Sequence, residues 1–543
     1  MKRRRRPLLW LARLRAPSGI NTAASLGVAL GLSASLLSVQ ARADGPIGNN
    51  GSRIQTSEYA VDLHQGTISS GSRIIGLSGA YVAIAEGVAG SPQTPVAVAH
   101  RKPHSTGHFD FDFGLGVTFP STLRNTDYFN TGRDSTRLRD ADQQDAVFFS
   151  PALTLQWGRF GVGVSSEIQT YSLKETVVGD LNREQDELKA QFFVTHTQIA
   201  YGFADGQLLL GGGLRLISLD VTHTGTGSDG EQRDTLLFST SGLGTELGAL
   251  WRPNGEQYRV GLAFRSSVDT AATNLGTMAP LDNGDRIVPS NANANLDDPT
   301  QLAAVLNNES TIWLPERASL PWDFNAGFAL QLGARPLNPR WEDPEDTLDI
   351  LQQELKRRAV QRQRIRNREL AQGIANGSEP GDLARALDAE VERETAVDEL
   401  KLERVARETT ARLRERYEKM RRSYLLVSMA LLVTGRVRDA VGIESFLQRV
   451  VDRSGDLVVL SPRLGVEAEP VPNLTRIRAG SYGEPSRFSR GAPRLHGTVG
   501  FDQRLFRWTL FGLFAPNTHW RLSAALDAAP RYLGWSGGLG IWH

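Results

Sequence analysis

The chain has 543 residues, and its 61 lysine and arginine residues against 60 aspartate and glutamate residues give a formal net charge of +1 at pH 7. This balance provides no electrostatic basis for binding nucleic acid, so nucleic-acid partners are excluded. Cysteine is absent, which excludes disulfides, cysteine-bound zinc and thiol catalysis. After the N-terminus no apolar run reaches the roughly 18 residues of a spanning helix, but spanning strands remain open because alternation dilutes their hydropathy.

Residues 1–43 have the three parts of a secretory signal peptide. A basic leader is followed by an apolar core at 25–39 and by Ala41-Arg42-Ala43, an A-x-A cleavage site. We therefore expect export and a mature chain that begins at Asp44. An uncleaved anchor helix is the alternative, but the apolar core is short for a span.

Residues 108–119 alternate with a period of two. Their sequence is HFDFDFGLGVTF, in which every odd position from Phe109 to Phe119 is apolar and the even positions carry Asp110, Asp112, two glycines and a threonine. A period of two is that of a strand. In a soluble sandwich the apolar face would meet a protein core, whereas in a membrane barrel it would meet lipid while the acids face a wet lumen.

Some fifteen segments share this character, most of them longer than the roughly 5–6 residues of a globular strand. Besides 108–119, the predicted strands are 147–157, 160–168, 190–203, 206–219, 235–251, 256–268, 320–332, 424–435, 457–468, 474–482, 494–501, 505–514, a strand around 520–527, and 532–543. A tilted membrane strand needs about 9–11 residues, so length favours the membrane. Bacterial barrels have an even strand number, so one of the fifteen is expected to be wrong.

The connections alternate between short and long. Two-residue connections at 158–159 and 204–205 and the turn at 252–255 each join two strands into a hairpin. Long polar segments lie between the hairpins, at 121–146, 174–188, 222–234 and 269–319. Outer-membrane barrels have short periplasmic turns and long outer loops. The sequence thus predicts an all-β transmembrane barrel, with a first half at 108–340 and a second half at 424–543.

Residues 341–423 break this pattern because they have helix spacing and mixed charge, with a break at 377–381. We predict a helical hairpin, each arm reaching about 50 Å at 1.5 Å per residue. The alternation of turns assigns it to the periplasmic side. It is either a solvated charged pair without a partner or an arm that docks a periplasmic protein.

Residues 69–101 read SSGSRIIGLSGAYVAIAEGVAGSPQTPVAVAHR, and residues 460–488 read LSPRLGVEAEPVPNLTRIRAGSYGEPSRF. These two stretches resemble the long-chain fatty acid transporter family of outer-membrane barrels, with its hydrocarbon-uptake and secretion-associated relatives. The first, at 69–101, is similar to the family's N-terminal G-x-R-x-x-G-M-G-G-A-Y-V-A run; its matching residues are Gly71, Arg73, Gly76, Gly79, Ala80, Tyr81, Val82 and Ala83. Leu77-Ser78 replaces Met-Gly, and the following Asn-Pro-Ala turn keeps only prolines, Pro92 and Pro95. The second, at 460–488, is similar to a late strand of these barrels through Arg478-Ala479-Gly480.

The resemblance implies about 14 antiparallel strands and a lumen plugged by an N-terminal hatch, here 44–107, that rearranges to let a ligand pass and leave sideways into the bilayer. Glycines in this segment permit close packing, and its apolar residues need a surface or a hydrophobic ligand to cover. Simple plug packing is the alternative to a ligand role. The expected ligand or gate residues are Arg73, Ile74, Ile75, Gly76, Leu77, Gly79, Tyr81, Val82, Pro92 and Pro95.

No pattern singles out an enzyme, a metal site or a cofactor. His100, His104 and His108 recur every four residues, but Pro103 and Gly107 argue against a continuous helix that would bring them together. The expected function is passive passage of small hydrophobic molecules, fatty-acid-like or hydrocarbon, across the outer membrane of a Gram-negative bacterium. The alternative is a barrel scaffold that anchors a secretion or envelope complex through its helical arm.

Overall fold

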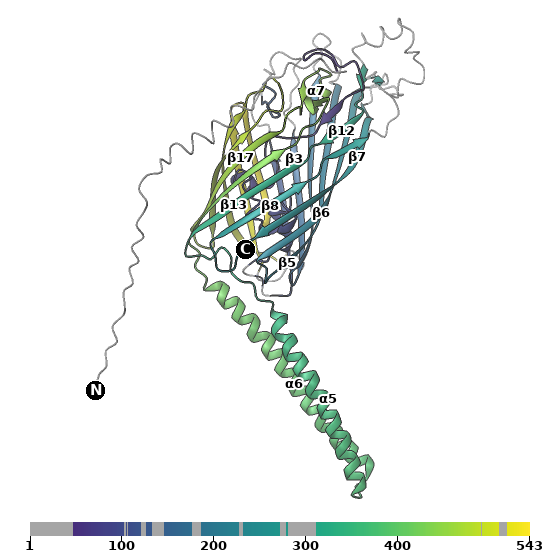
Figure 1. Cartoon of the computed structure of the whole chain (residues 1–543), viewed down its shortest axis with the longest axis vertical. Coiled ribbons are helices and arrows are strands. Elements are labelled where there is room, and N and C mark those ends of the chain that lie inside the picture. Colours follow the sequence, from purple (N-terminus) through teal and green to yellow (C-terminus); the bar gives the residue numbers. More distant parts are fainter. Residues whose placement is uncertain are drawn as a thin grey trace, which may run out of the picture. The chain divides into compact units, whose positions relative to one another are not determined.

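A computed structural model describes residues 47–102, 105, 107–120, 126–132, 146–175, 186–226, 232–271, 278–280, 311–489, 491–509 and 518–542. The predicted signal peptide lies outside these residues. Fourteen antiparallel strands form a closed barrel, which confirms the predicted fold class (Figure 1). They are β2 (Phe109–Phe119), β3 (Val147–Trp157), β4 (Phe160–Glu175), β5 (Asp186–Phe203), β6 (Leu208–Thr226), β7 (Gln232–Trp251), β8 (Tyr258–Arg265), β13 (Asp323–Gly333), β14 (Tyr424–Thr434), β17 (Val459–Val471), β18 (Thr475–Glu484), β19 (Arg494–Arg507), β20 (His519–Ala529) and β21 (Tyr532–Ile541).

The barrel closes where β2 pairs with β21, from Gly114 opposite Gly540 to Phe119 opposite Trp535. One predicted strand is wrong. Residues 505–507 continue β19 and residues 508–509 are not in a strand, while 510–517 lie outside the described residues. The strand continues through the polar run 502–504, at which the sequence analysis divided it, with a register shift between Arg504 and Arg507.

The outer face of the barrel is apolar and its inner face is polar. On β2, Phe109 is half exposed while Asp112, on the other face, is buried and accepts a hydrogen bond from the backbone N–H of Val88 inside the barrel. The same division holds along β3, β5 and β7, whose large exposed side chains are Val147, Leu153, Trp157, Ile199, Tyr201, Phe203, Leu236, Leu243, Leu247 and Trp251. A lipid-facing belt around a charged interior is the pattern of a spanning barrel.

At the long-loop end, a small sheet covers the lumen. Its strand order is β16-β15-β1-β12-β9, and its bounds are β16 (Arg453–Ser454), β15 (Ala440–Gly442), β1 (Ala60–Asp62), β12 (Arg317–Leu320) and β9 (Val268–Ala271). Strand β1 runs parallel to both of its neighbours. We call this sheet, with helix α7 (Ile443–Leu447), the cap. A separate two-stranded pair is formed by β10 (Met278–Pro280) and β11 (Thr311–Trp313).

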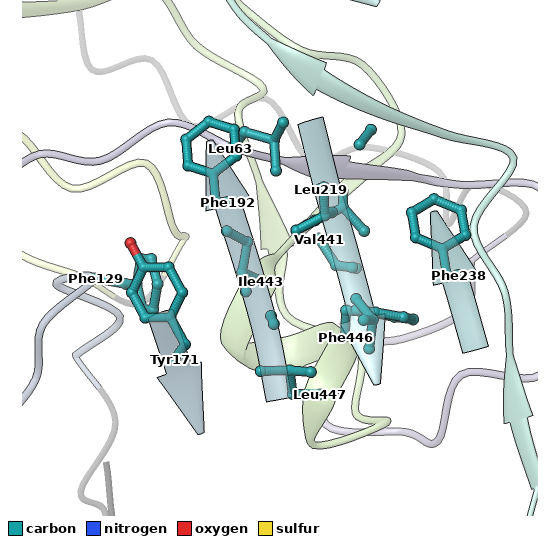
Figure 2. Packing of buried hydrophobic residues seen from close by; sticks show 14 of the residues in the cluster. Leu63, Phe129, Tyr171, Phe192, Leu219, Phe238, Val441, Ile443, Phe446 and Leu447 are labelled. Atoms are coloured by element: carbon teal, nitrogen blue, oxygen red, sulfur yellow. The ribbon is translucent and has the colours of Figure 1, made fainter. Parts of the chain in front are cut away.

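The cap packs on apolar side chains of the inner barrel wall. Phe192, Leu219 and Phe238 point inward from β5, β6 and β7 and belong to the same buried cluster as Val441 and Phe446 (Figure 2). Because these strands extend well beyond the roughly 9–11 residues of a span, their inner faces supply a protein core rather than a wet lumen at this end.

The helical insertion is present as predicted, as α5 (Pro344–Ala375) and α6 (Pro380–Glu418) (Figure 1). Helix α5 begins where the Asp343 side chain accepts a hydrogen bond from the backbone of Glu345, with Pro344 in the first turn. Between the helices Gly377 has a φ of +88°, which favours glycine. Within the described part of the chain, no helix combines the length and apolar character needed to cross a bilayer.

Ion pairs connect the two helices. Arg362 of α5 donates to Asp398 at 2.6 Å, and Arg366 donates to Asp388 at 2.9 Å. In α6 only Thr409 and Leu413 are buried among the described side chains. The base of the pair lies at the short-turn end of the barrel, because Asp343 pairs with His108, whose backbone contacts the turn after β3.

Candidate functional site

The lumen holds the N-terminal segment, which we call the hatch (47–107). It contains three short helices, α2 (Ser72–Gly76), α3 (Gly87–Gly90) and η1 (Pro95–Ala99), and nearly all of their residues are buried. Glycines of the wall let its backbone come close. A Cβ added at Gly161 would lie 2.0 Å from the carbonyl oxygen of Val98, and one at Gly261 would lie 2.2 Å from that of Val82. The main chain of the hatch therefore lies directly against the main chain of the wall.

Arg73 connects the hatch to the wall through charge. Its guanidinium donates to both carboxylate oxygens of Glu467 on β17, each at 3.0 Å, and to the Tyr81 hydroxyl at 2.8 Å. It also donates to the Glu86 carboxylate at 3.1 Å. The same carboxylate accepts a second hydrogen bond from Arg259 on β8 at 2.9 Å. Burial alone would raise the pKa of the Glu86 carboxyl, but the two guanidiniums hold that pKa well below its ordinary value.

The predicted ligand or gate residues divide into two groups in the structure. Ile74, Ile75, Leu77 and Tyr81 are fully buried in one cluster, which is plug packing. Val82 lies in a second small cluster against Ala263 and Ala430 of the wall. The ligand role of these side chains remains a prediction.

The other predicted positions lie against the wall. Gly76 contacts the main chain of β19 and Gly79 has a φ of +68°. Pro95 starts η1, and the carbonyl oxygen of Pro92 accepts a hydrogen bond from Arg265. Of the ten predicted residues, Arg73 and Pro92 line the cleft described below.

The hydrogen-bonded ladder between two wall strands is interrupted at two rungs, which the sequence analysis did not single out. Strands β3 and β4 pair in one register, with Phe149 opposite Ile168 and Ala152 opposite Ser165, but the two rungs between them are unpaired. We call this the wall gap; it consists of Ser150, Pro151, Ser166 and Glu167. Both flanking ladders, β2 with β3 and β4 with β5, stay paired at these positions. Proline has no N–H to donate to a ladder, so Pro151 in the strand pattern was the available signal.

An apolar cleft leads from the hatch to the wall gap. It has a cavity volume of about 60 Å³ and is open to the outside. The hatch contributes Val88, Ala89 and Pro92, and the wall contributes inward-facing Ser165 together with outward-facing Leu115, Pro151, Ser166 and Leu539. Residues of both faces of the wall thus line the cleft, and three of the four wall-gap residues, Ser150, Pro151 and Ser166, are among them.

A closed antiparallel barrel with a lipid-facing belt, a charged interior and a plugged lumen defines the class of membrane-spanning β-barrels. No protein-family model matches the chain and no curated protein matches it. Among solved structures, the CymD monoaromatic hydrocarbon channel is 9% identical, with 88% of this chain and 97% of that chain covered and a TM-score of 0.40. The P. putida toluene transporter TodX is 8% identical, with 88% and 98% covered and a TM-score of 0.43.

CdiB from Acinetobacter baumannii is 6% identical, with 80% of this chain and 60% of that chain covered and a TM-score of 0.31. At these TM-scores the similarities add nothing to the topology described above.

Proposed function

We propose that this protein is an outer-membrane channel that lets small hydrophobic molecules pass and releases them sideways through the wall gap. The observation that carries the proposal is the apolar cleft between hatch and wall, which reaches lipid-facing Leu115 and Leu539 at the unpaired rungs. An apolar solute in this cleft would move from protein to acyl chains without entering water, which is where its transfer is costly. No covalent step is required.

The absence of cysteine from the chain makes a direct test possible. In the double variant Pro151→Cys/Ser166→Cys, a disulfide would tie the two strands at the gap. Leu153→Cys/Val164→Cys is the matched control, because these residues face each other on a paired rung and point outward, as Pro151 and Ser166 do. Uptake of a radiolabelled long-chain fatty acid and of a radiolabelled alkylbenzene is measured in a Gram-negative host without its own such channel, oxidised and then reduced.

We expect oxidation to lower uptake at least tenfold in the gap variant, with recovery on reduction, and to leave the control unchanged. Full uptake by the cross-linked gap variant would show that release does not occur there. Failure of the unsubstituted protein to raise uptake of either solute above the host's background would contradict passage itself.

A second function is favoured by two other observations. The cap and the inner wall pack into a continuous buried cluster at the long-loop end, which closes the lumen from that side, and the helical pair leaves many charged side chains exposed. These features suit a scaffold that docks a periplasmic protein through 341–423. Co-purification of one periplasmic protein with the full chain, its loss from a chain lacking α5 and α6, and no uptake above the host's background by the full chain would together favour the scaffold over the channel.

A further inference from the structure

A second cavity lies between the hatch and the short-turn end of the barrel. Its walls are the start of α3, the turn after β7, and residues 335–339, which lead toward α5. Eight of its 18 lining residues are arginine or lysine, and two, Glu86 and Asp112, are acidic. Its interior is therefore strongly cationic, unlike that of the apolar cleft.

Carboxylates behind the lining do not balance this charge. Including Arg478, which shares two of these carboxylates, nine cations stand against six carboxylates within 4.0 Å of them among the residues that the structure describes. The ion pairs are Arg73 with Glu86 and Glu467, Arg101 with Asp110, Lys102 with Asp112, Arg259 with Glu86, Arg335 and Arg476 with Glu469, Arg478 with Glu467 and Asp502, and Arg521 with Asp502. The difference, nine minus six, is three positive charges.

Arg252 has no carboxylate partner within 4.0 Å among the described residues, although it is only 5% exposed. One of its terminal nitrogens donates to the carbonyl oxygen of Pro339 at 3.0 Å, and its Nε is buried without an acceptor. The Nε of Arg521 is likewise buried without an acceptor, with Asp502 at 3.9 Å. A buried guanidinium without a counter-charge is costly, so these donors favour an anion in the cavity.

We propose that this cavity is an oxyanion-binding site for a carboxylate or phosphate group, with Arg252 and Arg521 as its principal donors. Guanidinium groups present paired N–H donors that match such groups. The cavity shares Arg73, Ala89 and Arg521 with the apolar cleft, so an acid with an apolar tail can occupy both spaces whereas free phosphate can occupy one. This site goes beyond the proposed passage and does not depend on it, because binding is measured without transport.

The test uses the purified full chain in detergent and isothermal titration calorimetry with three probes: sodium phosphate, sodium hexanoate and the neutral 1-hexanol. The variants are Arg252→Gln and Arg521→Gln. The control is Arg368→Gln, which removes one positive charge from an exposed site on α5. Heat-modifiable gel mobility verifies that each variant is folded, and the second cavity variant serves if the first does not fold.

We expect saturable binding of at least one anion, weakened at least tenfold by either cavity variant and unchanged by the control. Tighter binding of hexanoate than of phosphate would identify an amphipathic acid as the source of the oxyanion, and the reverse would identify free phosphate. Absence of saturable binding of both anions overturns the site. So does equal binding of hexanoate and 1-hexanol that neither cavity variant weakens, because the tail alone would then account for it.

Discussion

At the residue scale, Arg73 is the point where hatch and wall charges meet, and removing it tests that junction. In Arg73→Met, Glu467 keeps Arg478 and Glu86 keeps Arg259. We therefore expect a loss of about 2–3 kcal/mol in the free energy of unfolding, somewhat less than the ~3–5 kcal/mol for a broken buried pair. Urea unfolding in lipid vesicles measures it. Arg368→Met on the exposed face of α5 should stay within about 0.5 kcal/mol, and equal losses in both variants would refute the role of Arg73.

A second residue-scale prediction concerns the close approach of hatch and wall at Gly161. Gly161→Ala places a Cβ against main chain that cannot swing away, so we expect overpacking to lower the free energy of unfolding by about 1–3 kcal/mol. Gly537→Ala is the matched control, because a Cβ there meets nothing within 4 Å. If the two variants unfold at the same urea concentration, the hatch does not fit the wall as tightly as described.

Residue by residue, the sequence allowed one side of the Arg73 junction to be predicted. Arg73 stood out through the family resemblance, but Glu467 follows it by 394 positions, and no local pattern pairs residues so far apart. The same holds for Arg252, whose significance depends on a missing carboxylate rather than on any motif. A proline inside a strand pattern is different, since Pro151 could have indicated the wall gap from the sequence alone.

At the element scale, the helical pair should be dispensable for the barrel. Strands β13 and β14 pair through 11 rungs from Asp323 to Gly333, so replacing 344–418 by a short Gly/Ser turn should leave heat-modifiable mobility intact. Residues 341–343 are kept, because the Trp341 indole donates to the carbonyl oxygen of Ser105 and stacks on Arg101. A shortened chain that no longer shows the folded gel band would mean that the pair helps the barrel to assemble.

Long elements were predictable and short ones were not. The alternation in the fourteen barrel strands repeats often enough to identify each of them, and the helix spacing in 341–423 does the same for α5 and α6. The cap strands have two to four residues each, which is too short for any period to be recognised. Their pairing depends on which loops meet above the lumen, and that is set by the closed barrel.

At the scale of the whole molecule, stability should be uneven. Strands β5, β6 and β7 are paired on both sides and support the buried cluster under the cap, whereas α5 and α6 bury few side chains. Hydrogen exchange measured by mass spectrometry should therefore be slowest in those strands and at least a hundredfold faster in the helical pair, because local opening follows local burial. Equal protection in both regions would mean that the helices are covered by a partner.

The parallel strand β1 has a consequence for how the protein is made. It is inserted between β12, from the first half of the chain, and β15, from the second, while β2 starts at the opposite end of the pore and seals against the last strand, β21. We therefore expect the leading segment to lie in the interior before β2 pairs with β21. Assembly would then follow a fixed order, in which the hatch is placed first and the barrel closes around it.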